Sequence, residues 1–185
     1  KPGQVGGGHL EGGPDPVEGA EGLAEQFLEQ LAALRREGED QPLPAGNWPL
    51  LSASPQQYVE GVSDWSRAMT RAEMGAIRDE FVAATRRAID AGFDWLELHC
   101  AHGYLLSAFL SPLTNQRDDA YGGSLENRLR YPLEVFEAMR AVWPAGLPMS
   151  VRISAHDWVA GGNTPHDAVQ MARAFKAAGA DLIDV

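Results

Sequence analysis

Two histidines and a tyrosine lie within six positions of one another at the end of a short apolar run. Residues 96–98 lead directly into His99, and His102 and Tyr104 follow. Polar groups gathered at the end of a strand cost desolvation energy unless they have partners, so the pattern favours a site for an anion or a carbonyl oxygen. Two imidazoles can donate to one oxygen on which negative charge develops, and a phenol that stays protonated near neutral pH can act as an acid.

Helices and strands are expected to alternate around these residues. Thr70 and Glu73 form a capping box that begins one helix, and Gly92 ends it. Thr164, as N-cap, and Pro165, in the first turn, begin another. The full expectation from residue 95 onward is a strand over 95–99, a long loop over 101–126, a helix over 129–143, a strand over 149–154, a helix over 165–178 and a strand over 180–185.

This order of elements predicts an α/β protein with a parallel sheet. Three strands cannot close a barrel. The expected fold is therefore a partial TIM (β/α)8 barrel that holds about strands 4 to 6 with their helices, and in such barrels the chemistry lies at the carboxyl ends of the strands.

The N-terminal part has a different composition. Residues 1–40 are expected to form a glycine-rich leader (1–19) and one amphipathic helix (20–36), with no assigned role. Residues 41–185 are expected to form the barrel domain, and they begin with a proline-punctuated, extended connector over 41–60.

Composition excludes several classes of protein. The 185 residues are 44% hydrophobic and 22% charged, which is typical of a soluble globular chain, and no apolar run approaches the ~18 residues of a membrane span. No secretory signal peptide is evident. A net charge of −11 argues against nucleic acid, and the single Cys100 fits a reducing, cytoplasmic compartment. A small-molecule substrate is the expected partner, and self-association is left open.

Several motifs together resemble the flavin-dependent old yellow enzyme family. They are Ala91-Gly92-Phe93-Asp94, the stretch from His99 to Leu106, Phe109-Leu110-Ser111-Pro112, Thr114-Asn115-Gln116-Arg117, the stretch from Tyr121 to Arg128, and Val151-Arg152-Ile153-Ser154. Within that family, residues 42–49 and His156-Asp157-Trp158 are most similar to the C-terminal reductase part of the bifunctional salicylyl-CoA 5-hydroxylase and 2-aminobenzoyl-CoA monooxygenase/reductase proteins.

The resemblance implies an FMN-dependent oxidoreductase of the ene-reductase type, with NAD(P)H as reductant. It implies that His99 and His102 bind the substrate carbonyl, that Tyr104 protonates the substrate, and that Arg152 meets the N1–O2 edge of the flavin. It further implies an unsaturated or dearomatised aromatic CoA thioester as substrate, reduced within a monooxygenase/reductase of aromatic degradation. The family's segments for the FMN phosphate are not among these residues.

Other interpretations of the same residues stay open. A metal site at His99 and His102 is disfavoured because Glu97 is expected on the opposite face of the strand. Arg152 is expected to stand alone on an apolar strand, and Cys100 is expected to pack in the core. His156 and Asp157 either touch a CoA ester or cap a loop. The polar loop residues are expected to be structural: Asn115, Arg117, Asp118, Tyr121, Glu126, Asn127 and Arg128. The alternative to an enzyme is a non-catalytic part of a barrel that needs further strands or a partner chain.

Overall fold

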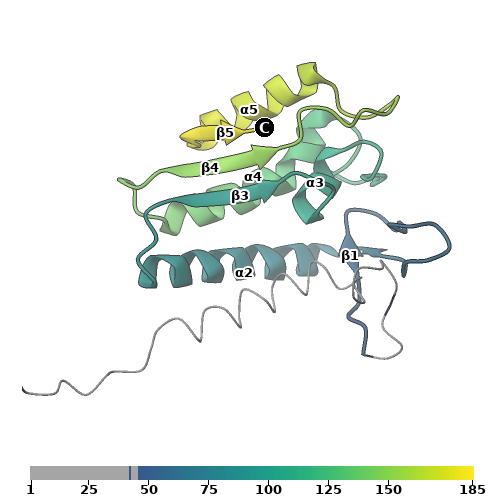
Figure 1. Cartoon of the computed structure of the whole chain (residues 1–185), viewed down its shortest axis with the longest axis horizontal. Helices are drawn as coiled ribbons and strands as arrows, with labels where there is room; N and C mark the ends of the chain where they lie inside the picture. Colours follow the sequence, from purple (N-terminus) through teal and green to yellow (C-terminus); the bar gives the residue numbers. More distant parts are fainter. Residues whose placement is uncertain (1–41, 43–45) are drawn as a thin grey trace, which may run out of the picture.

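A computed structural model of the chain describes residue 42 and residues 46–185 (Figure 1). A parallel sheet in the order β3-β4-β5 forms its centre, and the prediction of a parallel α/β sheet is confirmed. The strands are β3 (Leu96–Cys100), β4 (Met149–Ile153) and β5 (Leu182–Asp184). The helices are α2 (Arg71–Asp90), α3 (Leu105–Leu110), α4 (Leu125–Val142) and α5 (Pro165–Ala178).

Local sequence signals set the ends of the longer helices. Thr70 caps α2 in a reciprocal capping box with Glu73, and Thr164 does the same for α5 with Asp167. Each box satisfies two backbone N–H groups that a helix start leaves without partners. Gly179 ends α5 with a φ of 105°, a left-handed conformation that glycine adopts without strain. The predictions for these two helices are confirmed.

The predicted long loop over 101–126 is wrong. It contains α3, and α4 begins at its end because the Ser124 side chain accepts a hydrogen bond from the Asn127 backbone N–H. Five of the six residues of α3 are buried. A helix that is buried on nearly all sides shows no apolar stripe of helical period, so this sequence gave no sign of it.

The connector expected over 41–60 is wrong in part. Within it lies β1 (Leu51–Ser52), which pairs in parallel with β2 (Arg67–Ala68). Strands of two residues are too short for an alternating pattern to be seen. The leader, the amphipathic helix over 20–36 and the boundary at residue 40 lie outside the described residues.

The helices cover one face of the sheet and form the core there. Leu98, Val151 and Ile153 point into it from the strands. Phe136 of α4 and Phe175 of α5 meet edge to face with ring centroids 5.7 Å apart. Within the described part of the chain, no helix is long and apolar enough to cross a membrane.

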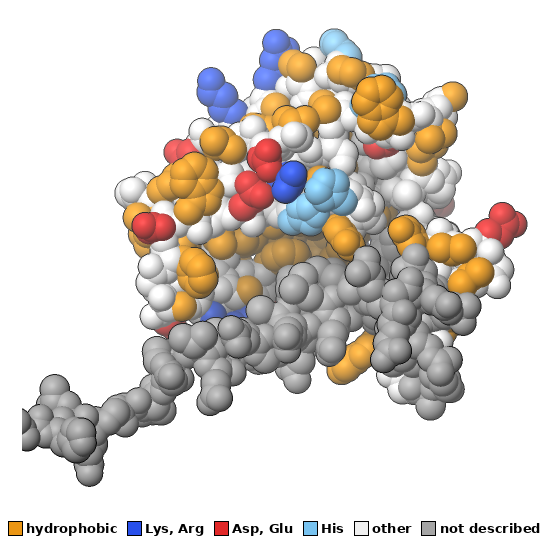
Figure 2. Space-filling model, in the orientation of Figure 1, with side chains coloured by type: hydrophobic (Ala, Val, Ile, Leu, Met, Phe, Trp, Pro, Cys, Tyr) orange, Lys and Arg blue, Asp and Glu red, His pale blue; other side chains and the backbone are white. Residues whose placement is uncertain are grey.

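The opposite face of the sheet carries polar side chains, and we call it the open face. Register pairs Glu97 with Ser150 and His99 with Arg152, so these four side chains share that face, and Arg152 also pairs with Asp184. Figure 2 shows histidine, arginine and acidic side chains together on it. Glu97 was expected on the face opposite His99, and this is wrong, because residues two apart on a strand point the same way.

Candidate active site

His99, His102 and Tyr104 come together at the carboxyl end of β3, and we call them the strand-end cluster. The ring centroid of His99 lies 5.0 Å from that of His102 and 5.5 Å from that of Tyr104. Tyr104 remains 44% exposed, so its phenol faces solvent at the mouth of the site. The structure therefore places one imidazole and one phenol close to the His99 ring.

Backbone geometry at the end of β3 turns His102 toward His99. His102 has a φ of 61°, which is uncommon for a residue with a side chain, and Gly103 follows at 78°. The His102 N–H donates to Ser154 Oγ at 3.1 Å, and the Gly103 N–H donates to Ser107 Oγ at 3.2 Å. Ser154, immediately beyond β4, thus ties together the ends of two neighbouring strands.

The surroundings of His99 favour its neutral form. Partial burial lowers the pKa of His99, and the nearby His102 and Arg152 lower it further, whereas Glu97 raises it. A neutral imidazole has one N–H donor and one acceptor nitrogen. His99 is therefore suited to donate a hydrogen bond to a ligand oxygen without carrying a full positive charge.

Arg152 does not stand alone on the open face, contrary to expectation. Its Nε lies 3.2 Å from Oδ2 of Asp184 on β5, and both side chains are partly exposed. That contact lacks the geometry of a hydrogen bond, and Arg152 Nε is the one buried side-chain polar atom in the described residues without a hydrogen-bond partner. A guanidinium balanced by one carboxylate, with an unused donor, is a fitting partner for the polar edge of a ligand.

Two hydrogen bonds join the neighbouring strands β3 and β4 nearer to their amino ends. Trp95 Nε1 donates to Ser150 Oγ at 2.9 Å, and Ser150 Oγ donates to Glu97 Oε2 at 2.8 Å. Glu97 is thus engaged with Ser150. Within the described residues, no group of three or more His, Cys, Asp or Glu side chains is placed to hold a metal ion.

The polar loop before α4 makes structural contacts, as expected. Asn115 donates to the backbone oxygens of Phe109 and Tyr121 at 2.8 and 2.7 Å. Arg117 donates to the backbone oxygens of Ala53 and Met69, the residues that follow β1 and β2, and pairs with Asp119 at 2.6 Å. Asn115 thus holds the loop to itself and to α3, and Arg117 holds it to the segments that follow β1 and β2.

Arg128 likewise donates to the backbone oxygens of Leu110 and Gly123. Cys100 is buried in the core as expected, and burial raises the pKa of its thiol. Asp157 caps the loop after β4, where its Oδ2 accepts from Ser111 Oγ at 2.6 Å and from the Asn163 backbone N–H at 2.8 Å.

Three members of the site were missed from the sequence: Ser154, Asp184 and Glu97 as a residue of the open face. Each acts through a neighbouring strand, so strand register was needed to find it. The sequence signal that could have found them is the alternation of side chains along a strand. This alternation places Ser150 and Arg152 on one side of β4, and Leu182 and Asp184 on one side of β5.

Comparison with known proteins identifies relatives of the chain. Residues 26–185 match the model of the NADH:flavin oxidoreductase / NADH oxidase family. An NADPH dehydrogenase of Clostridium acetobutylicum is 50% identical over 120 residues, which are 64% of this chain and 34% of that protein. The chain thus spans about a third of the length of the curated relatives that it matches.

Solved structures are also similar to the chain. A 2-naphthoyl-CoA reductase in complex with 2-naphthoyl-CoA superposes with a TM-score of 0.68 at 31% identity, over 75% of this chain and 21% of that one. An old yellow enzyme homologue from Zymomonas mobilis gives 0.65 at 27% identity, over 74% and 41%. These neighbours confirm the expected fold, a part of a (β/α)8 barrel.

Proposed function

The chain belongs to the NADH:flavin oxidoreductase / NADH oxidase family. We propose that it provides the substrate-facing strands of an FMN- and NAD(P)H-dependent ene-reductase. The observation that carries the proposal is the meeting, at one edge of the open face, of the strand-end cluster with Arg152. This arrangement combines oxygen-directed donors, an acid and a cation.

The residues present fit a flavin. Arg152 would hold its polar N1–O2 edge, because the guanidinium is partly exposed and its Nε has no hydrogen-bond partner in the described chain. The Arg152 cation would suit a ring that gains negative charge on reduction, and the neighbouring Asp184 carboxylate would offset part of that effect. The chemistry that FMN supplies when bound is hydride transfer from NAD(P)H to the β-carbon of an unsaturated carbonyl compound.

His99 and His102 would bind the carbonyl oxygen of the substrate. When the β-carbon gains hydride, negative charge develops on that oxygen, and donors already aimed at it stabilise the transition state by several kcal/mol. With ring centroids 5.0 Å apart, the two imidazoles are close enough that one N–H of each could donate to the same oxygen atom beside the pair. The lowered pKa of His99 means that it donates as a neutral imidazole near neutral pH.

Tyr104 would deliver the proton that completes the reduction at the α-carbon. Its phenol is held beside His99 and is open to solvent, so water can restore the proton after each cycle. A phenol carries a proton that it can give to a carbanion-like carbon.

We further propose that the substrate is an unsaturated or dearomatised aromatic CoA thioester, which is reduced within a monooxygenase/reductase. The similarity to a 2-naphthoyl-CoA reductase that binds a CoA thioester supports this class. So does the likeness of the His156-Asp157-Trp158 segment to reductases of aromatic CoA esters.

The test compares two substrates with the full gene product that contains these residues. After anaerobic reduction with NADPH, reoxidation of the flavin by an α,β-unsaturated acyl-CoA is measured beside reoxidation by 2-cyclohexenone. The proposal expects both compounds to reoxidise the flavin and the thioester to do so faster. Reoxidation by neither compound would refute the ene-reductase, and equal rates would refute the thioester preference.

A further inference from the structure

The loop between β4 and α5 presents a tryptophan that the proposed reaction leaves unused. Trp158 is 87% exposed and has a φ of 59°. In the described part of the chain, its only non-glycine companion at positive φ is His102 of the strand-end cluster. A bulky side chain in this strained conformation persists only when surrounding contacts hold it, and such residues gather at functional sites.

The base of this loop is firmly held. Besides accepting from Ser111 and Asn163 through its carboxylate, Asp157 donates its own backbone N–H to the Asn163 oxygen at 3.1 Å. Asn163 Oδ1 in turn accepts from the buried Arg128. These hydrogen bonds hold the base of the loop in place, and Trp158 projects from that fixed base.

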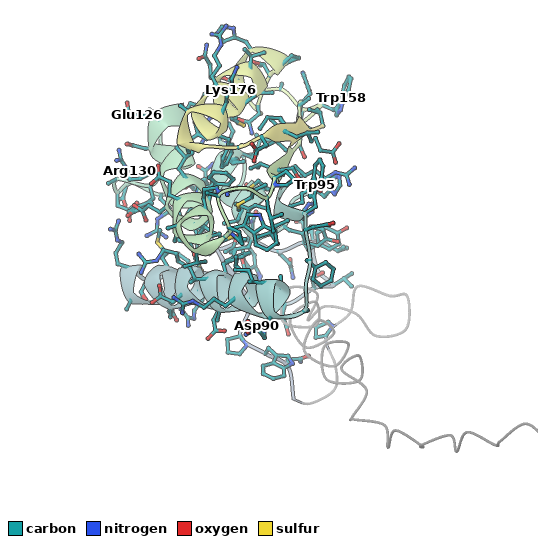
Figure 3. All side chains as sticks on the ribbon, turned by 90° about the vertical axis from the view of Figure 1, so that its left-hand side faces the viewer. Asp90, Trp95, Glu126, Arg130, Trp158 and Lys176 are labelled. Atoms are coloured by element: carbon teal, nitrogen blue, oxygen red, sulfur yellow. The ribbon has the colours of Figure 1, made fainter. Side chains whose placement is uncertain are left out.

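His156 supports the indole from within the loop. Its ring centroid lies 4.7 Å from that of Trp158 at an interplanar angle of 40°, and its Nδ1 accepts the Trp158 backbone N–H. Figure 3 shows Trp158 projecting from the side of the molecule on which Trp95 lies, away from α4. Trp95 contacts the open face through Ser150, so Trp158 stands at the rim of that same side.

We propose that Trp158, backed by His156, is a stacking subsite for the adenine ring of a ligand whose reactive end lies at the strand-end cluster. The inference rests on the proposed function, because it takes the reacting carbonyl to be at the end of β3. Trp158 follows β4, one strand further along the sheet, and four residues past Ser154. A rim position of this kind meets a remote part of the ligand.

Adenine is the chemistry that suits such a rim. CoA thioesters and NAD(P)H both carry an adenine nucleotide far from their reacting atoms, and an exposed indole stacks on purines without needing specific hydrogen bonds. With a net charge of −11 the chain offers little general attraction to phosphates, so ring stacking is the contact that holds this end of the ligand.

The experiment measures equilibrium dissociation constants with the FMN-loaded full gene product and its Trp158→Ala variant. The probes are coenzyme A beside 4′-phosphopantetheine, and NADP⁺ beside nicotinamide mononucleotide, so each pair differs by the adenine portion. Val159→Ala, at the neighbouring exposed position, is the matched control, and Trp158→Phe tests rescue by another flat ring.

In Trp158→Ala the dissociation constant of one adenine-bearing probe should rise about tenfold, with its adenine-free comparator unchanged. A rise for coenzyme A identifies a thioester as the source of the adenine, and a rise for NADP⁺ identifies the dinucleotide. No change, or an equal loss for adenine-free comparators, would overturn the inference. Binding at equilibrium needs no hydride transfer, so a protein that passed this test yet reduced no unsaturated thioester would contradict only the proposed function.

Discussion

Replacing Tyr104 by phenylalanine removes one oxygen atom from the strand-end cluster and leaves the ring in place. If this phenol supplies only the proton to the α-carbon, the variant should reoxidise its flavin slowly with an unsaturated carbonyl compound. Reduction of the flavin by NADPH involves no such proton, so its rate should stay as in the unchanged protein.

The expected size follows from the exposure of the phenol. A positioned acid contributes about 10²–10⁴-fold to a proton transfer. Tyr104 is 44% exposed, so water can reach the same carbon and replace part of its action. We therefore expect the lower end of the range, about 10²-fold, which corresponds to about 2.7 kcal/mol of activation free energy.

Anaerobic stopped-flow absorbance of the full gene product resolves the two half-reactions. Tyr58→Phe removes a phenol oxygen from a highly exposed tyrosine in the loop between β1 and β2, and serves as the matched control with both rates unchanged. An equal slowing of both half-reactions by Tyr104→Phe, or no slowing of either, would refute the role of Tyr104 as the acid.

Further predictions concern the donors, the cation and the loop. Replacing either histidine of the strand-end cluster by alanine should weaken binding of a phenol such as 4-hydroxybenzaldehyde about tenfold or more in a titration of the flavin spectrum; unchanged affinity would contradict the donor role. Asp184→Asn removes the negative charge beside Arg152 and should raise the flavin midpoint potential in a dye-coupled titration, whereas a fall would oppose this assignment. Gly162→Ala places a methyl group 2.6 Å from Asp157 Cβ and should lower the free energy of unfolding by about 1–3 kcal/mol. Gly146→Ala, whose added methyl group meets open space, is the control in thermal denaturation. Equal stabilities of the two variants would count against a tightly packed loop.

The sheet and its flanking helices could be predicted because their signals are local. The capping boxes at Thr70 and Thr164 fix helix starts within four residues of sequence. Helix α3 could not be predicted, because burial on nearly every side removes the apolar stripe. Arg117 bonds to Ala53 and Met69, which directly follow β1 and β2 and lie 64 and 48 residues earlier in the chain, and a local pattern does not reveal such a distant partner.

The candidate site divides in the same way. His99, His102 and Tyr104 lie within six positions, and one strand end brings them together, so their meeting was predictable. The partner of Arg152 was not predictable from the sequence. Arg152 lies on β4, and its partner Asp184 lies on the neighbouring β5, more than thirty residues later in the chain. Register between strands depends on the whole core, which the residues around a motif do not encode.

One spectrum tests the central claim, that this chain provides the active face of an FMN-dependent ene-reductase. The full gene product is purified, its visible absorbance is recorded, NADPH is added without oxygen, and an unsaturated carbonyl compound follows. The account predicts a flavin band that NADPH bleaches and that the carbonyl compound restores. A purified, folded gene product that binds no FMN, or a bleached flavin that no unsaturated carbonyl compound restores, would contradict it.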